Sequence, residues 1–167
     1  MIYTGQTGWM QGHEYGFIFD STYNDFVSGE LENAIVSCYK ALDPAVIFLE
    51  GQASLSNPSG PCGSEYLLSG QAKGVILQHL PTREFFAGHE STGLAISIDR
   101  DLELIRLYGA ETLAITLNTK GIGLEEAMKF KSEYEDKYGL PVILPIEEGV
   151  EALFEVVNEY MNNFEKK

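Results

Sequence analysis

The feature that most constrains this chain is a repeated change between short, continuously apolar runs and longer stretches with helical periodicity. The apolar runs do not alternate with polar residues, which is typical of strands covered on both faces of a parallel sheet. The clearest runs are residues 45–50, 74–79, 112–117 and 141–144, with a fainter one at 16–19. Apolar residues at 3.6-residue spacing predict helices at 25–42, 102–108, 124–138 and 148–164.

Strands that alternate with crossover helices form right-handed βαβ units. We therefore predict an α/β fold with three layers and a mostly parallel, doubly wound sheet. The 167 residues fit one domain, so residues 1–167 are expected to form a single α/β domain. Ligands of such sheets bind beyond the carboxyl ends of the strands, so the site is expected in the loops that leave them.

The ends of two predicted helices carry recognisable signals. Asn24 or Asp25 is a candidate cap for the helix that ends at Leu42. Tyr138 and Gly139, shortly before Pro141, are typical of a helix C-terminus.

Charge excludes two classes of partner. The chain has 11 Lys and Arg against 25 Asp and Glu, a formal charge of −14, which repels nucleic acid and anionic membranes. An anionic small molecule remains compatible, because local backbone N–H groups can outweigh a distant net charge. Cys38 and Cys62 have no metal-ligand spacing, and no apolar run approaches the roughly 20 residues of a membrane span, so we expect a reduced, cytoplasmic protein.

Glu50 ends the buried run at 45–50 and is followed by Gly51. A carboxylate at a strand exit suits a group that binds Mg²⁺ beside nucleotide phosphates. The alternative is an acid that caps the next segment or pairs with a neighbouring base. Both interpretations remain open from the sequence.

Asn118 and Lys120 follow the run at 112–117. An Asn carboxamide can hydrogen-bond the edge of a nucleotide base, and a Lys stem can pack on its face. An Asn turn with a solvated lysine explains the same residues.

The segment Thr4, Gly5, Gln6, Thr7 combines glycine with hydroxyl and amide side chains near the N-terminus. Such residues can offer N–H and O–H groups to an anion, which makes them candidate cofactor ligands. A tight turn is the alternative.

His79 and Arg83 lie at the exit of the run at 74–79. An imidazole beside a guanidinium suits the binding of a carboxylate or phosphate, and His79 is the best candidate acid or base in the sequence. A satisfied core histidine is the alternative. Asp20 and Asp25 flank the exit of the fainter run and are candidate substrate ligands, although Asp25 is also a normal helix-start residue.

Common catalytic motifs are absent from these 167 residues. The sequence contains no G-x-S-x-G, H-E-x-x-H or G-x-G-x-x-G pattern, and no G-x-x-x-x-G-K-[ST] phosphate loop.

Several short motifs together resemble one known family. The matching segments are Thr4-Gly-Gln-Thr-Gly-Trp9, Asp20 with Asp25-Phe-Val-Ser-Gly29, Glu50-Gly-Gln-Ala-Ser-Leu-Ser56, His79 with Pro81 and Arg83, Leu117-Asn-Thr119 and Gly139-Leu-Pro-Val142. They resemble, in order and over nearly the whole chain, the bacterial and archaeal P-loop family of largely unknown function that includes D-glutamate N-acetyltransferase. Glu50-Gly51 and the Asn118 loop are also distantly similar to dethiobiotin synthetase.

The resemblance implies a P-loop NTPase-like nucleotide-binding core, with ATP or acetyl-CoA and Mg²⁺ as cofactors. It implies that Glu50 is the acidic residue beside the metal and Asn118 the base-side residue. In the acetyltransferase branch, acyl transfer from acetyl-CoA to a D-amino acid needs a base and oxyanion donors, roles that His79, Gln52 or Ser54 can perform.

The chain departs from the family in one large respect. Family members carry an N-terminal domain and a Gly-Lys-Thr phosphate loop before the part that aligns with Met1. We therefore expect a C-terminal portion that does not hydrolyse ATP alone. The alternatives are a non-catalytic binding module and a structural module that works with a partner supplying the missing half. A sheet edge left uncovered predicts a homo-oligomer, most simply a dimer.

Overall fold

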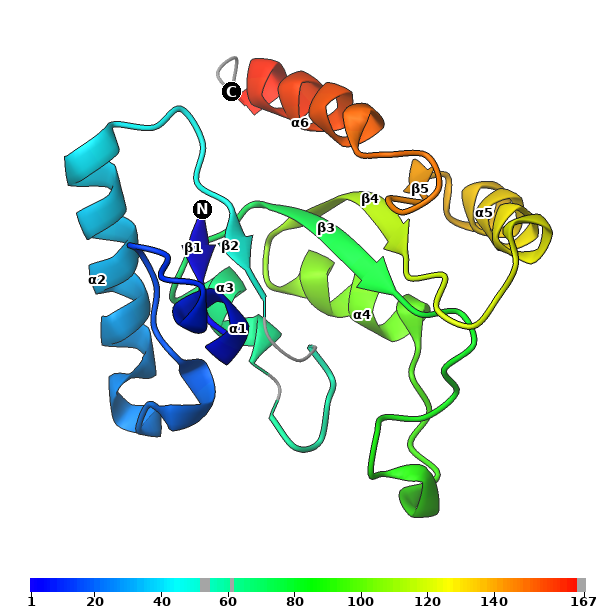
Figure 1. The fold of residues 1–167 in the computed structure, drawn as a ribbon, viewed down its shortest axis with the longest axis horizontal. Coiled ribbons are helices and arrows are strands. Elements are labelled where there is room, and N and C mark those ends of the chain that lie inside the picture. The colour runs from blue at the N-terminus through cyan, green and yellow to red at the C-terminus, as the bar shows by residue number, and fades with distance from the viewer. Residues whose placement is uncertain (52–54, 61, 165–167) are drawn as a thin grey trace. The chain divides into compact units, whose positions relative to one another are not determined.

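The computed structural model describes residues 1–51, 55–60 and 62–164 and has an α/β fold. The chain forms two compact units, residues 1–72 and 73–167 (Figure 1). The expectation of a single domain stays a prediction. Among the described residues, no helix combines the length and apolarity needed to span a lipid bilayer.

The first unit contains a two-stranded parallel sheet. Strand β1 pairs with β2 so that Ile2 lies opposite Leu49 and Tyr3 opposite Glu50. Its elements are β1 (Ile2–Tyr3), α1 (Gln6–Met10), a 3-10 helix (Phe19–Ser21), α2 (Asn24–Leu42), β2 (Leu49–Glu50) and α3 (Gly63–Leu68). The predicted strand at 45–50 is therefore shorter than expected, and β1 was not predicted.

Helix α2 forms because one of its faces is apolar at helical spacing. Val27, Leu31, Ala34 and Cys38 are buried and pack with residues that include Ile2. The expected cap is wrong: Tyr23 occupies the cap position and makes no side-chain cap hydrogen bond. The helix instead has a defined end, because Asp43 adopts a left-handed conformation and its N–H bonds the carbonyl of Tyr39.

The fainter run at 16–19 is not a strand. Gly16 makes a single bridge to Tyr3, and the chain then turns into the 3-10 helix that begins at Phe19. Gly16 is required at the bridge, because a Cβ on its backbone (φ 152°) would meet the carbonyl oxygen of Tyr3. The apolar side chains of Phe17 and Phe19 still reach the core of this unit, which is why the run looked strand-like.

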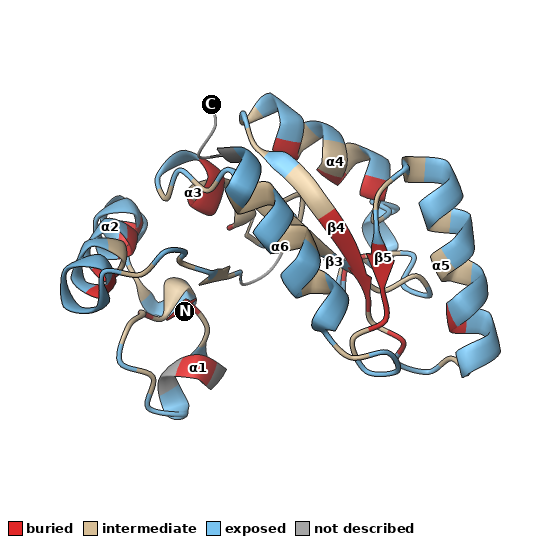
Figure 2. Cartoon of the chain, turned by 90° about the horizontal axis from the view of Figure 1, so that it is seen from above, coloured by how far each residue is buried: buried red, intermediate tan, exposed pale blue. Residues whose placement is uncertain are grey.

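The second unit contains a three-stranded parallel sheet in the order β3, β4, β5. Its elements are β3 (Gly74–His79), a 3-10 helix (Glu90–Thr92), α4 (Ile98–Leu107), β4 (Glu111–Leu117), α5 (Leu124–Tyr138), β5 (Val142–Ile143) and α6 (Glu151–Phe164). Helices α4 and α5 connect consecutive strands and lie on one side of β4, while α6 lies on the other, as Figure 2 shows. This unit therefore has three layers.

The centre of the second unit is strand β4. Ala114, Ile115 and Leu117 are almost fully buried, and Val142 and Leu144 add to the same core. Burial on both faces explains why the strand reads as a continuous apolar run. Gly139 takes a left-handed conformation that ends α5, as its position after Tyr138 predicted.

Candidate functional site

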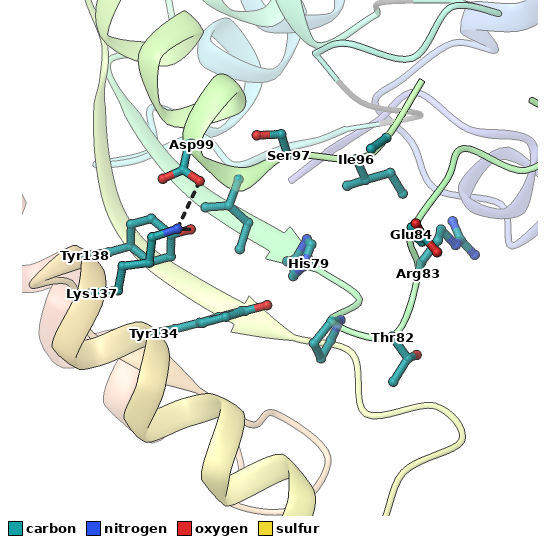
Figure 3. Close-up of a pocket in the computed structure, with 13 residues that line it drawn as sticks. His79, Thr82, Arg83, Glu84, Ile96, Ser97, Asp99, Tyr134, Lys137 and Tyr138 are labelled. Atoms are coloured by element: carbon teal, nitrogen blue, oxygen red, sulfur yellow. Dashed lines mark hydrogen bonds and ion pairs between the residues drawn. The ribbon is translucent and has the colours of Figure 1, made fainter. Parts of the chain in front are cut away.

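A pocket of about 380 Å³ lies at the carboxyl end of β3 in the second unit (Figure 3). It is lined by His79, Pro81, Thr82, Arg83, Glu84, Ala95, Ile96, Ser97, Ile98, Asp99, Tyr134, Lys137 and Tyr138. Its size is near the lower end of the roughly 300–1,000 Å³ common for small-molecule sites. The strand-exit position is where the sequence predicts ligand binding.

Three segments meet at this pocket because of the βαβ connection. The chain leaves β3 at His79, and α4 begins at the same edge of the sheet. Ser97 fixes that beginning, since its side chain accepts the N–H of Arg100 at 3.2 Å. Helix α5 supplies the remaining wall from its C-terminal half, where Tyr134, Lys137 and Tyr138 face the cavity (Figure 3).

His79 is a half-buried, uncharged imidazole at neutral pH. Burial lowers its pKa from 6.5 to about 4, because a low-dielectric environment disfavours the charged ring. The ring lies 5.8 Å from that of Tyr134 between centroids, at 52°. Its carbonyl accepts the N–H of Asn118 at 2.7 Å. The imidazole therefore stays neutral throughout the physiological pH range, and its unprotonated ring nitrogen can accept a hydrogen bond or the proton of an acidic intermediate.

Lys137 is held at the pocket edge by three contacts. Its ammonium donates to Asp99 Oδ2 at 3.0 Å and to the hydroxyl of Tyr138 at 3.0 Å, and it lies 4.7 Å from the centroid of the Tyr138 ring. The hydroxyl of Tyr138 and then the carboxylate of Asp99 raise the pKa of Lys137. The lysine is thus charged and positioned, yet exposed.

Charges of both signs line the pocket. Arg83 and Lys137 are cationic and Glu84 and Asp99 are anionic, while His79 is neutral. Figure 3 shows Lys137 and Asp99 on one side of His79 and Arg83 and Glu84 on the other. Such a lining complements a molecule that itself carries charges of both signs.

In the loop after β4, Asn118 forms the Asn turn that was the alternative to a nucleotide-base contact. Its Oδ1 accepts the N–H of Lys120 at 3.0 Å, which is an Asn turn, and Lys120 is exposed. Thr119 is buried, and its hydroxyl donates to Glu147 Oε1 at 2.5 Å. Since Asn118 also bonds His79 through the backbone, the structure brings these two predicted residues together at neighbouring strand exits.

The first unit brings Thr4 and Glu50 together at the carboxyl ends of β1 and β2. The buried hydroxyl of Thr4 donates to the carbonyl of Glu50 at 2.8 Å. Because this hydroxyl has one hydrogen, the Tyr66 hydroxyl at 2.5 Å donates to it. The N–H of Thr4 also approaches Glu50 Oε2 at 3.5 Å. The hydroxyl of Thr4 therefore has its hydrogen-bond partners within the fold.

The other candidates of the first unit lie near this sheet edge in sequence. Gly5 follows Thr4, and Gln6 and Thr7 begin the five-residue helix α1. Asp20 lies in the 3-10 helix, where its charge adds to burial in raising the pKa of Cys62. Asp25 is in the first turn of α2, as its helix-start interpretation predicted.

Two candidates, Gln52 and Ser54, fall outside the described residues. The position of ligand sites in doubly wound sheets also predicts that Glu50, Gln6, Asn118 and His79 line one mouth. This stays a prediction, because these residues belong to both units. Within the described ranges, no group of three or more His, Cys, Asp and Glu side chains is placed to hold a metal ion.

Comparison with known proteins gives the family. The family described as "Domain of unknown function (DUF1611_C) P-loop domain" matches residues 1–154. The chain belongs to this family. The match confirms the resemblance found in the sequence, although the 167 residues contain no G-x-x-x-x-G-K-[ST] motif.

Two relatives show how much of a family member the chain covers. D-glutamate N-acetyltransferase of Tritonibacter scottomollicae is 29% identical over 160 residues, which is 92% of this chain and 47% of that protein. The crystal structure of a DUF1611 family protein from Anabaena variabilis matches with a TM-score of 0.83 at 22% identity, over 95% of this chain and 47% of that chain. The structural likeness confirms the P-loop-like α/β fold, and the chain spans about half the length of both relatives.

The part of the pocket that α5 and the start of α4 supply was not predicted from the sequence. Tyr134, Lys137, Tyr138 and Asp99 lie 20 to 59 positions from His79 and come to it only through the fold. The sequence of this chain does contain one signal of the α5 face that packs beside the pocket. Phe130, Tyr134 and Tyr138 repeat at four-residue spacing and form an aromatic ladder with centroid distances of 6.1 and 5.8 Å.

Proposed function

We propose that the chain supplies the amino-acid site of an N-acetyltransferase that acts on an acidic D-amino acid such as D-glutamate. The observation that carries this proposal is a neutral His79 in a pocket whose lining has two cations and two anions. The relative of 29% identity that is named D-glutamate N-acetyltransferase supports the same reaction class.

The lining suits an acidic amino acid because such a molecule has two carboxylates and one amino group. Arg83 and Lys137 provide one cation for each carboxylate, and an acidic side chain is available for the ammonium group. The cavity of about 380 Å³ has room for this substrate and for the thioester end of an acyl donor.

The chemistry assigned to His79 is proton acceptance from the attacking amine. The amine nitrogen attacks the carbonyl carbon of the acetyl thioester, so that a C–N bond forms and the C–S bond breaks. The substrate ammonium group first gives one proton to solvent, which leaves the neutral amine that attacks. The second proton, lost by the nitrogen as the C–N bond forms, passes to the imidazole and then to the departing thiolate, which leaves as the free thiol. Burial keeps the imidazole unprotonated before the attack, which is the form a base needs.

Acetyl-CoA would serve as the acyl donor, and a nucleotide with Mg²⁺ fits the remaining candidates. Magnesium takes one or two carboxylates together with phosphate oxygens, so the half-buried Glu50 would hold it only with a bound nucleotide. Asn118 and Lys120 would lie on the base side, with Thr4, Gly5, Gln6 and Thr7 toward the phosphates. ATP hydrolysis by this chain is not expected, since the sequence provides no phosphate-loop lysine.

The test is release of free thiol from acetyl-CoA in the presence of D-glutamate. We expect turnover by the wild-type chain and a loss of about 10²–10⁴-fold in His79→Gln, the usual contribution of a general base. His13→Gln is the matched control, because His13 belongs to the first unit and stacks on Tyr3. Binding of D-glutamate without thiol release would favour the non-catalytic binding module, and equal rates in wild type and His79→Gln would contradict the proposal.

A further inference from the structure

The ion pair of Lys137 and Asp99 joins α5 to α4 at the edge of the pocket. Its two side chains come from positions 38 residues apart and meet at 3.0 Å. Both remain largely exposed, with 55% and 65% of their side-chain surface accessible. Since both residues also line the cavity, the pair lies where a ligand can reach it.

A second pair on α5 has the features of a structural ion pair. Lys131 reaches both carboxylate oxygens of Glu148 at 2.7 Å, and these side chains are only 21% and 35% exposed. Glu148 also approaches the N–H of Leu144 at 3.3 Å and so links α5 to the end of β5. In the Lys137–Asp99 pair, the ammonium contacts one carboxylate oxygen, and both side chains are more exposed than those of Lys131 and Glu148.

An exposed ion pair contributes little to stability, because water solvates both charges almost as well as they solvate each other. Separation of Lys137 from Asp99 therefore costs little if a ligand replaces each partner. Lys137 would keep its place during the exchange, since the hydroxyl and ring of Tyr138 also hold its ammonium.

We propose that Lys137 and Asp99 form an exchangeable pair that determines specificity for an α-amino acid. The α-carboxylate of the ligand replaces Asp99 on Lys137, and the adjacent α-ammonium replaces Lys137 on Asp99. The geometry matches. The ammonium of Lys137 and the carboxylate of Asp99 are in direct contact, and an α-amino acid carries its ammonium and carboxylate groups on one carbon atom. Arg83 is then available to the distal carboxylate.

This inference extends the proposed function, because it assigns the recognition of its substrate to two residues that the motifs did not indicate. Unlike the proposed function, this inference does not require acetyl transfer to occur. The exchange is a binding step that occurs without any acyl donor, so it can be measured when no chemistry takes place.

Two ligands distinguish the roles of the pair: D-glutamate, and glutarate, which has both carboxylates but no amino group. Titration calorimetry would give the affinity of wild type, Asp99→Asn and Lys137→Met for each. In Lys137→Met we expect both affinities to fall about tenfold, since a charge-assisted hydrogen bond is lost. Lys137→Arg, which keeps the charge, should retain most of the binding.

Asp99→Asn gives the decisive result. Its affinity for D-glutamate should fall about tenfold, because the ammonium loses its carboxylate. Its affinity for glutarate should rise severalfold, because Asp99 no longer competes for Lys137. Lys129→Met is the matched control: Lys129 pairs with Glu133 on α5 at 3.8 Å and is not among the pocket residues.

A change of both affinities in the same direction in Asp99→Asn would overturn the inference, and so would unchanged binding in Lys137→Met. Absence of binding of either ligand to the wild-type chain at millimolar concentration would also overturn it. Circular dichroism of each variant would show that the fold is retained. If D-glutamate binds with the expected crossover but no acetyl transfer follows, the proposed function fails and the inference stands.

Discussion

The two units use polar side chains differently at the carboxyl ends of their parallel strands. In the first unit, the Thr4 hydroxyl bonds the carbonyl of Glu50 and the hydroxyl of Tyr66, and Thr4 is fully buried. In the second unit, His79 and Lys137 line a cavity of about 380 Å³. The first strand exit thus satisfies the Thr4 hydroxyl within the fold, and the second leaves charged side chains facing a space that a ligand can enter.

The contrast between Thr4 and the pocket residues shows that a polar residue at a strand exit does not by itself indicate a ligand site. What distinguishes the two exits is the partner of each group. A buried hydroxyl bonded to backbone and to tyrosine stabilises the fold, whereas charges around a cavity have water as their alternative partner. Substitution of Thr4 should therefore change stability, and substitution of Lys137 or Asp99 should change binding.

The largest expected effect on stability comes from Thr4→Val. The change keeps the shape of the side chain but leaves the carbonyl of Glu50 and the hydroxyl of Tyr66 without their buried partner. We expect the free energy of unfolding to fall by about 1–3 kcal/mol, measured by urea denaturation. Thr4→Ser, which keeps the hydroxyl, should recover most of this loss. Full stability in Thr4→Val would place Thr4 among residues that serve a ligand instead.

A smaller effect than that of Thr4→Val is expected from His79, which should make the free energy of unfolding depend on pH. The pKa of His79 falls from 6.5 to about 4 in the folded chain, so the unfolded state binds more protons between these pH values. Stability should therefore decrease as pH falls from 6.5 to 4. The upper limit from the shift is about 3 kcal/mol, and solvent screening of the half-buried ring reduces it to about 1–2 kcal/mol.

The comparison of wild type with His79→Gln isolates this contribution. The difference between their free energies of unfolding should change with pH between 6.5 and 4 and be constant above pH 7. Denaturant titrations at several pH values measure it. A pH-independent difference would mean that the pKa of His79 is the same in the folded and unfolded chain, so that burial does not lower it.

A third prediction separates the structural ion pair from the exchangeable one. Lys131→Met removes the partner of Glu148, whose pKa the ammonium holds below its usual value, and should cost about 0.5–1 kcal/mol at pH 7. The loss should diminish as pH falls below 4.5 and through the lowered pKa of Glu148 in the folded chain, because the carboxylate then becomes protonated in both states. Lys137→Met should leave the thermal midpoint unchanged, and a clear decrease there would make Lys137 a structural residue.

The smallest expected effect on stability is that of Glu50→Gln, since among the described residues its carboxylate makes one long contact, to the N–H of Thr4 at 3.5 Å. Its effect should appear in nucleotide binding. If Glu50 holds Mg²⁺, magnesium should strengthen ATP binding to the wild-type chain and not to Glu50→Gln, as calorimetry with and without the metal would measure. Equal magnesium dependence in both would remove Glu50 from the metal site.

Much of the fold could be predicted because its longer elements satisfy local rules. The α2 and α5 boundaries match the periodicity to within one residue, and α5 ends where Gly139 takes a left-handed conformation. Helix α4 began four residues earlier than expected, because Ser97 caps it before the apolar pattern becomes visible. Strand β1 has only two residues and no periodicity to detect.

The candidate site could be predicted only in part. His79 and Arg83 follow a buried strand, so the topology alone brings them to the correct sheet edge. Asp99 and Lys137 also line the pocket, but their positions depend on how α4 and α5 pack beside that edge. Such tertiary proximity has no short-range pattern, and only the aromatic spacing along α5 indicated which of its faces is covered.

The most direct test of the contrast between the two units is a ¹H–¹⁵N NMR titration of the wild-type chain with D-glutamate. We expect the amide signals of residues 79–84, 97–99 and 134–138 to shift, while those of Thr4, Glu50 and Tyr66 keep their positions. Shifts centred on Thr4 and Glu50, or no shift at saturating ligand, would contradict it.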